Sequence, residues 1–203
     1  MKSAAVLAVL VCLAGSSPLL AQSSKPLLRD AELPLLAAPD FAGALPAEFI
    51  VAKGKWTPKD GVLHVLDLPQ QKHIPVLHHK VGLTAAVIEV EFLIEGSGSF
   101  LVGCDATKHV GRVVVQPKTF SIAEDSVKPS HPIAKLPVTT RPGVWHRLRV
   151  EWRDDRMAAN LDGKELRAQH KYLATPKSRS WIAAGKSVKI RNLKISGRET
   201  TRP

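Results

Sequence analysis

Two glutamates two residues apart are the sharpest candidates for chemistry in this chain. Glu89 and Glu91 lie in a segment where polar and apolar residues alternate. Alternate side chains of an extended strand point to the same side, so the two carboxyl groups are expected on one face, about 7 Å apart. Paired carboxylates act as acid and base in glycoside hydrolysis. The competing interpretation is that both glutamates are solvated residues on an outward sheet face.

A second pair of candidates follows an apolar run in the middle of the chain. Asp105 and His109 come just after Phe100–Cys104, where they are expected to share a loop end. A carboxylate beside an imidazole is a plausible acid–base or metal-binding couple. Glu124 and Asp125 could join Asp105 in an oxygen-rich calcium site, but the favoured interpretation is a plain polar loop. Because no His-x-x-x-His or Cys-x-x-Cys pattern occurs, we expect no zinc site. We predict no metal ligands and no cofactor, and nothing in the residues supports a structural calcium ion.

A third candidate surface is aromatic and basic. Trp145, Arg147 and Arg149 alternate with apolar residues, so they are expected on one face, with Trp152 on the other. Sugar rings stack on exposed indoles, and arginines suit an acidic sugar. These three residues are therefore the predicted substrate-binding group. Packing in the core or in a hairpin is the alternative interpretation of the tryptophans.

The elements that must position these residues are extended. Val87–Ile94 and Trp145–Arg153 both alternate with period two, and Asp162-Gly163 is a strong hairpin turn. Near the end of the chain, a bulge at Arg191-Asn192 would bring two apolar pairs to the same side. No window of helical length carries an apolar stripe with period 3.6. The pattern predicts an all-β protein, a two-sheet antiparallel sandwich of roughly eleven or twelve short strands.

Composition limits the class of protein and of partner. The 203 residues are 44% hydrophobic and 23% charged, which is ordinary for a globular domain and excludes a fully disordered chain. Lysine and arginine exceed aspartate and glutamate by 29 to 18, a net charge of +11. This excess favours anionic partners, an acidic glycan among them, although a solvated basic face would also explain it. No nucleic-acid-binding motif is present, so we expect no nucleic acid partner.

The first residues are typical of an export signal. Lys2 precedes an unbroken apolar run, and cleavage after Ala21 would leave Gln22 as the new N-terminus. The run is too short to span a bilayer, and no later segment is longer, so no transmembrane segment is expected. We expect an exported protein, periplasmic or extracellular, in which Cys104 is an unpaired structural thiol. The predicted organisation is a signal peptide (1–21), an extended Pro/Ala/Leu-rich segment (22–45), a β-sandwich domain (46–197) and a tail (198–203).

Three separated motifs resemble a known family. Residues 56–63 (WTPKDGVL), residues 143–164 (GVWHRLRV followed by NLDGK) and residues 187–195 (SVKIRNLKI) are similar, in order, to motifs of the 3-keto-disaccharide hydrolase domain. That family has a concanavalin A-like jelly-roll fold. The resemblance implies the same fold here, and cleavage of a glycosidic bond in a sugar or an oxidised disaccharide. The matching motifs are structural: they comprise turns, a tryptophan and the expected bulge.

Under the enzyme hypothesis, Glu89 or Glu91 is the acid/base, and Asp105 and His109 assist. The stretch Gly96–Asp125 is compact where members of the family usually carry longer loops around the substrate cleft. That difference favours a second hypothesis, a non-catalytic glycan-binding module that uses the Trp145 group. A third hypothesis is an interaction domain of the cell envelope. The residues alone do not separate the three.

Overall fold

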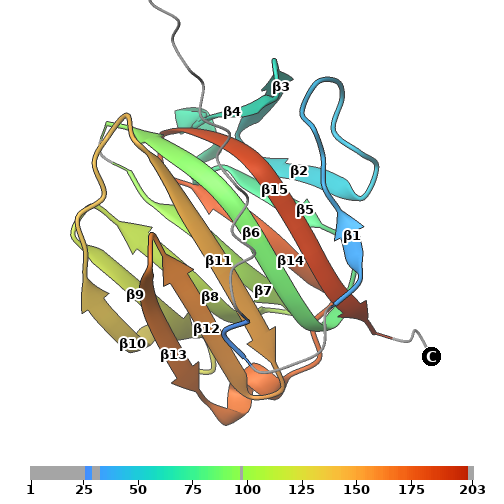
Figure 1. Cartoon of the computed structure of the whole chain (residues 1–203), viewed down its shortest axis with the longest axis vertical. Helices are drawn as coiled ribbons and strands as arrows, with labels where there is room; N and C mark the ends of the chain where they lie inside the picture. Colours follow the sequence, from blue (N-terminus) through green and yellow to red (C-terminus); the bar gives the residue numbers. More distant parts are fainter. Residues whose placement is uncertain (1–25, 29–32, 97, 201–203) are drawn as a thin grey trace, which may run out of the picture.

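The chain folds into two antiparallel sheets packed face to face (Figure 1). The structure, a computed structural model, describes residues 26–28, 33–96 and 98–200, so the predicted signal peptide lies outside the described residues. Sheet A has the order β13 (Lys164–Gln169), β12 (Arg156–Leu161), β11 (Trp145–Arg153), β6 (Leu83–Glu95), β15 (Ser187–Glu199), β4 (Val62–Leu66) and β3 (Lys55–Lys59), and β1 (Leu35–Ala37) also pairs with β15. Sheet B has the order β10 (His131–Pro137), β9 (Thr119–Glu124), β8 (His109–Gln116), β7 (Phe100–Asp105), β14 (Arg179–Ala184), β5 (Val76–His79) and β2 (Phe49–Lys53).

The predicted fold class is confirmed. In the described part of the chain the helical segments are two 3-10 turns, η1 (Pro69–Gln71) and η2 (Lys171–Ala174), and none is long and apolar enough to cross a membrane. The strands outnumber the predicted eleven or twelve because short strands such as β1 and β2 lack alternation. Four of the five residues of β2 are exposed, since this strand lies at an edge of sheet B. An edge strand buries too little to leave a period-two signal in the sequence.

Alternate side chains of the central strands form the core between the sheets. Ile88, Val90 and Phe92 of β6 are each at most 1% exposed, and Phe92 stacks on Phe100 of sheet B with ring centroids 4.2 Å apart. Trp152 of β11 is 2% exposed within this core, as its position in the alternation predicts. The expected inward and outward faces of β6 and β11 are therefore correct.

Turns and one bulge set the register of the strands. Asp162 (φ 49°) and Gly163 (φ 89°) connect β12 to β13 in the left-handed conformation that two-residue hairpins need. The pairing of β15 with β6 shifts between Arg191 and Lys194, and Asn192 has a φ of 52°. The predicted bulge is thus present, and it returns both Ile190 and Leu193 to the core.

Cys104 is a structural thiol, as the sequence predicts. Its side chain is fully buried on the inner face of β7, where Sγ donates to the carbonyl oxygen of Gly111 at 3.6 Å. Burial raises the pKa of the thiol to about 12. A thiol that stays protonated at neutral pH is a poor nucleophile, so Cys104 has no part in the chemistry considered below.

Candidate functional site

The outer face of sheet A carries the predicted glutamates, and arginines pair with them. Glu91 of β6 lies between two neighbouring strands: Arg147 Nη2 on β11 is 3.1 Å from Oε1, and Arg191 Nε on β15 is 2.7 Å from Oε2. Burial alone would raise the pKa of Glu91, but the hydrogen bonds and charges of Arg191 and Arg147 outweigh it and hold the pKa below its ordinary value. A carboxyl group held ionised in this way is poorly suited to be a general acid.

Glu89 also forms an ion pair with an arginine on this outer face of sheet A. Its Oε1 is 2.8 Å from Arg149 Nη1, and Arg149 Nε lies 2.6 Å from Oε1 of the buried Glu151. The backbone amides of Leu27 and Leu28 donate to the two carboxylate oxygens of Glu151 at 3.0 and 2.8 Å. Part of the predicted N-terminal extended segment is therefore fastened across this face, over β11 and β12.

Trp145 shares the outer face of sheet A with Arg147 and Arg149, as the spacing predicts. However, the guanidinium of Arg191 lies over the indole ring, 4.1 Å from its centroid. This cation–π contact occupies one face of the ring that a sugar would use. The side chains of the predicted substrate-binding group are thus already engaged by glutamates of β6 and by Arg191 of β15.

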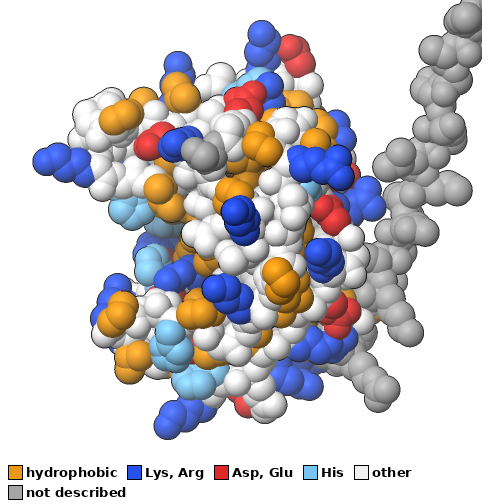
Figure 2. Space-filling model, turned by 90° about the vertical axis from the view of Figure 1, so that its left-hand side faces the viewer, with side chains coloured by type: hydrophobic (Ala, Val, Ile, Leu, Met, Phe, Trp, Pro, Cys, Tyr) orange, Lys and Arg blue, Asp and Glu red, His pale blue; other side chains and the backbone are white. Residues whose placement is uncertain are grey.

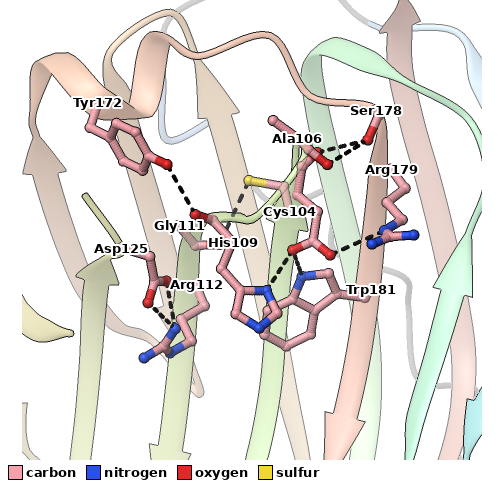
Figure 3. A network of polar contacts seen from close by, with 11 residues as sticks. Cys104, Ala106, His109, Gly111, Arg112, Asp125, Tyr172, Ser178, Arg179 and Trp181 are labelled. Carbon is pink, nitrogen blue, oxygen red and sulfur yellow. Dashed lines mark hydrogen bonds and ion pairs between the residues drawn. The ribbon is translucent and has the colours of Figure 1, made fainter. Parts of the chain in front are cut away.

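The outer face of sheet B carries a different cluster, centred on Asp105 at the end of β7. Figure 3 shows its members His109, Arg179 and Trp181 around one carboxylate. The Asp105 side chain is almost fully buried, and three donors bind its carboxylate. His109 Nδ1 and Trp181 Nε1 donate to Oδ1 at 2.7 and 2.6 Å, and Arg179 Nε donates to Oδ2 at 3.1 Å. Three strands, β7, β8 and β14, therefore converge on one carboxylate.

This arrangement fixes the ionisation of Asp105 and orients His109. Burial raises the pKa of Asp105, but the hydrogen bonds and charge of His109 and the hydrogen bonds of Trp181 and Arg179 lower it further than burial raises it. Because the carboxylate accepts, Nδ1 of His109 carries the proton, and Nε2 is left to meet a ligand or take up a proton. The imidazole is 48% exposed, so a molecule bound on this face can reach it.

The indole ring of Trp181 lies beneath the imidazole ring of His109. The indole lies across Gly103 of β7, where any side chain would collide with the ring. Trp181 is only 6% exposed, because its neighbours cover it: the His109 ring is tilted over it at 5.3 Å, and His78 pairs with it across β5 and β14. The indole thus positions polar groups on the surface and offers little open area of its own.

A groove continues from this cluster towards β10. Its floor begins at Arg112 of β8, whose Nη1 lies 2.5 Å from the buried carboxylate of Asp125. Polar and small residues line the groove, whose volume is about 220 Å³; the lining comprises Arg112, Val114, Gln116, Thr119, Ser121, Ala123, Ser130, Pro132 and Lys135. In Figure 2 the molecule is seen in profile, hollowed along the side where sheet B lies, with histidine, lysine and arginine side chains gathered in the hollow.

The structure brings together two of the four predicted catalytic residues and separates them from the other two. Asp105 and His109 are in contact on sheet B, whereas Glu89 and Glu91 lie on the opposite outer face of the sandwich. Two packed sheets stand about 10 Å apart, so a single glycosidic bond cannot lie within reach of both pairs of side chains. Strand alternation gives the face of each side chain within its own sheet, but it does not say which sheet a strand joins.

The acidic residues considered for calcium already have cationic or hydrogen-bond partners. Asp105 and Asp125 pair with Arg179 and Arg112, and Glu124 accepts from the backbone amide of Ser126 at 2.6 Å. Across the ranges that the structure describes, no group of three or more histidine, cysteine or acidic side chains could hold a metal ion.

Sequence reasoning missed Arg112 and Arg179 as members of this site. Arg179 and Trp181 alternate in residues 179–184, and this alternation could have placed both on one face. The partner of Arg179 and Trp181 is Asp105 of β7, more than 70 residues away, and the partner of Arg112 is Asp125, just after the neighbouring strand β9. Only strand pairing therefore reveals that these side chains meet Asp105 and Asp125.

Comparison with known proteins supports the fold and no more. No family model and no curated protein matches the sequence. The chain is similar to the endo-β-1,3(4)-glucanase SCLam of family GH16, with TM-score 0.61 and 12% identity over 86% of this chain and 95% of that one. It is also similar to the carbohydrate-binding module CBM66 of Bacillus subtilis, with TM-score 0.59 and 10% identity over 74% and 96% of the two chains.

A third similar structure is the exoplasmic/lumenal domain of VIP36 in a form bound to Ca²⁺ and Man3GlcNAc, with TM-score 0.56 and 11% identity over 77% and 86% of the two chains. At such low identities the similarity shows the fold alone, and function must be argued from the side chains of this protein. The chain has a concanavalin A-like jelly-roll fold.

Proposed function

We propose that this protein binds carbohydrate in the hollow on the outer face of sheet B. The observation that carries the proposal is a groove lined by hydroxyl, amide and cationic side chains, next to a half-exposed imidazole that a buried carboxylate holds in place. Sugars are recognised by such convergent hydrogen-bonding groups. Similar structures include a carbohydrate-binding module and the exoplasmic/lumenal domain of VIP36 in its Man3GlcNAc-bound form, which agrees with this use of the fold.

The side chains that face solvent in this hollow favour an acidic glycan. Arg112 and Lys135 line the groove, and no carboxylate is among the lining residues. Asp105 and Asp125 are each 3% exposed, so their partners cover both carboxylates, whereas the Arg179 side chain is 41% exposed. A sugar carboxylate would therefore meet donors and positive charge. The net charge of the chain has the same sign.

Two arginine variants test the location. Arg179 and Arg147 are each partly exposed and each pair with a carboxylate, one on sheet B and the other on sheet A. Arg179→Ala should weaken binding of uronate-containing oligosaccharides at least about tenfold, whereas Arg147→Ala should leave it within about twofold. Calorimetry against uronate-containing and neutral oligosaccharides of equal length measures both. Equal losses in the two variants would place the ligand elsewhere, and absence of any binding would end the proposal.

Cleavage of a glycosidic bond is the second candidate, and the Asp105–His109 pair favours it. An imidazole that a carboxylate orients through Nδ1, in a side chain that is 48% exposed, has the geometry of a general acid or base. The resemblance to the 3-keto-disaccharide hydrolase domain suggests an oxidised disaccharide as the substrate. His109→Gln should then lower kcat at least about a hundredfold and change KM little. Unchanged turnover in this variant would leave binding as the function.

We further propose that the protein acts after export, with Gln22 as its first residue. This proposal is supported by the order of residues 1–21, in which a positive charge is followed by an apolar run and then by small residues at the cleavage position. N-terminal sequencing of protein recovered from the periplasm or the medium tests it. A chain that keeps its first 21 residues inside the cell would contradict it.

A further inference from the structure

The hydrogen bond from His109 to Asp105 determines which ring nitrogen of His109 keeps a proton. His109 Nδ1 lies 2.7 Å from Asp105 Oδ1, and Trp181 Nε1 and Arg179 Nε donate to the same carboxylate. Burial raises the pKa of Asp105, but these hydrogen bonds and the charge of His109 together hold it below 3.8, so the carboxylate stays ionised where histidines titrate. An ionised carboxylate only accepts, so Nδ1 carries its proton in both the neutral and the charged ring.

The other ring nitrogen, Nε2, therefore changes its role with pH. In the neutral ring it holds a lone pair and accepts a hydrogen bond, and in the charged ring it holds a proton and donates. Nε2 points away from the Asp105 carboxylate (Figure 3), and the His109 side chain is 48% exposed. A ligand on the outer face of sheet B thus meets a neutral acceptor at high pH and a cationic donor at low pH.

The groups around the imidazole favour an anionic ligand. Arg179 of β14 binds the same Asp105 carboxylate as His109. On the side of η2, the Tyr172 hydroxyl donates to the carbonyl oxygen of His109 at 3.4 Å, and the Lys108 ammonium lies 5.5 Å from the centroid of the Tyr172 ring. Because three donors already bind Asp105, a ligand carboxylate that reaches this imidazole would meet little opposing negative charge.

His78 is the second imidazole near this cluster. It stands on β5, directly paired with Trp181 of β14. Burial lowers its pKa from 6.5, the charges of Arg179 and His109 lower it further, and the charge of Asp105 raises it by less. His78 therefore takes up a proton at a lower pH than an ordinary histidine does, and it stays neutral over the first part of an acid titration.

The charged groups at the end of β9 are paired among themselves. Nε2 of His131 and Nδ1 of His170 lie 3.8 and 3.7 Å from the carboxylate of Glu124, which is 1% exposed. Asp125 is bound by Arg112, whose Nη1 is 2.5 Å from the carboxylate. A positive charge gained by His131 or His170 would therefore face Glu124 before it faced a ligand.

We propose that an acidic glycan binds in the hollow of sheet B more tightly as the pH falls below neutrality, because Nε2 of His109 then becomes a charged donor to a sugar carboxylate. This pH response rests on the proposed function and belongs to the same site. In the neutral ring, the Nε2 lone pair and the sugar carboxylate are both acceptors, and the Asp105 hydrogen bond withholds the other tautomer. A sugar hydroxyl has no such preference, since it donates to the neutral ring and accepts from the charged one.

Calorimetry at about pH 7.5 and about pH 5.5, with a uronate-containing and a neutral oligosaccharide of equal length, tests the response. Sugar carboxylates stay ionised at both pH values. In the wild type, the acidic ligand should bind at least about fivefold more tightly at the lower pH, since a hydrogen bond from a charged group replaces a contact between two acceptors. The affinity for the neutral ligand should change less than about twofold.

Two histidine variants and one measurement on the wild type assign the response. His109→Gln should remove it, so that the affinity for the acidic ligand differs less than about twofold between the two pH values. His64→Gln is the matched control, because His64 lies on the outer face of sheet A between Lys189 and Thr57, and it should keep the full response. Calorimetry of the wild type in buffers of different ionisation enthalpy needs no variant: binding of the acidic ligand near about pH 7 should take up a net fraction of a proton.

Three results would overturn this pH response. If the acidic ligand binds equally at both pH values and without proton uptake, the response is wrong while the proposed function stands. If the response persists in His109→Gln, a group other than His109 causes it. If the wild type binds no oligosaccharide at either pH, the proposed function fails as well.

Discussion

Asp105→Ala tests whether the polar cluster on sheet B is held by one buried carboxylate. We expect this substitution to lower the free energy of unfolding by about 2 to 4 kcal/mol. Asp105 accepts three hydrogen bonds, from His109, Trp181 and Arg179, and its side chain is almost fully buried. Removing it leaves each of these donors without its acceptor.

The three donors do not contribute equally. Trp181 is 6% exposed, so its Nε1 would be left buried without a partner, at a cost of about 1 to 3 kcal/mol. His109 and Arg179 are 48% and 41% exposed, so water can replace the lost acceptor, and each contributes well under about 1 kcal/mol. The buried indole therefore accounts for most of the expected loss.

The pH dependence follows from the lowered pKa of Asp105. Its folded-state value lies below the ordinary value of 3.8, so the unfolded chain takes up the proton first as pH falls. The ionised carboxylate stabilises the fold fully above about pH 4 to 5. This contribution is lost as pH falls below 3.8 towards the folded-state pKa. The stability gap between wild type and Asp105→Ala should therefore be constant near neutrality and narrow in acid.

Urea unfolding at several pH values measures both effects. Asp60→Asn is the matched control, because Asp60 is an exposed turn residue with a φ of 52°, which asparagine tolerates, and it should change stability by less than about 0.5 kcal/mol. A loss of stability in Asp105→Ala no larger than in this control would refute the reasoning. If the difference in unfolding free energy between wild type and Asp105→Ala widens as pH falls, the assigned direction of the Asp105 pKa shift is wrong.

Three further outcomes are expected. Gly103→Ala places a methyl group against the Trp181 ring and should cost about 1 to 3 kcal/mol, and thermal unfolding near the wild-type temperature would contradict this. The Cys104 thiol, whose pKa is raised to about 12 by burial, should react with a disulfide reagent only as fast as the protein unfolds; rapid labelling of the native protein would show that the thiol is accessible. Burial lowers the pKa of His79 from 6.5 by more than the charges of Glu48 and Glu199 raise it, so the free energy of unfolding should decline as pH falls below 6.5. In His79→Phe, chemical denaturation should show a smaller decline of the unfolding free energy between pH 6.5 and lower pH. If the decline is unchanged, other titrating groups cause it.

Much of the architecture could be predicted from local sequence. The alternation of Val87–Ile94 determines which side chains of β6 face the core, and Asp162-Gly163 determines the hairpin between β12 and β13. Even the bulge at Asn192 follows from the change of apolar parity around it. These features depend on residues within a few positions of one another, so the sequence pattern contains them.

The candidate site could be predicted only in part. Asp105 and His109 are four residues apart on adjoining strands, and their pairing was expected from that proximity. The partnership of Asp105 with Arg179 and Trp181 joins residues more than 70 positions apart. Nothing in the local pattern specifies that β14 lies beside β7, because many strand orders bury the same alternate residues.

The sequence by itself therefore determined that the chain is a sandwich of alternating strands, and which side of each strand is apolar. Only the tertiary structure decided which polar faces share a surface: Glu89 and Glu91 stand among arginines on sheet A, while Asp105, His109 and Arg179 meet in the hollow of sheet B. The physical reason is that the period-two alternation of buried residues is a property of each strand alone. Which strands are neighbours in a sheet depends on hydrogen-bonded pairing between segments that are distant in the sequence. A site built across strands becomes visible only when that pairing is known.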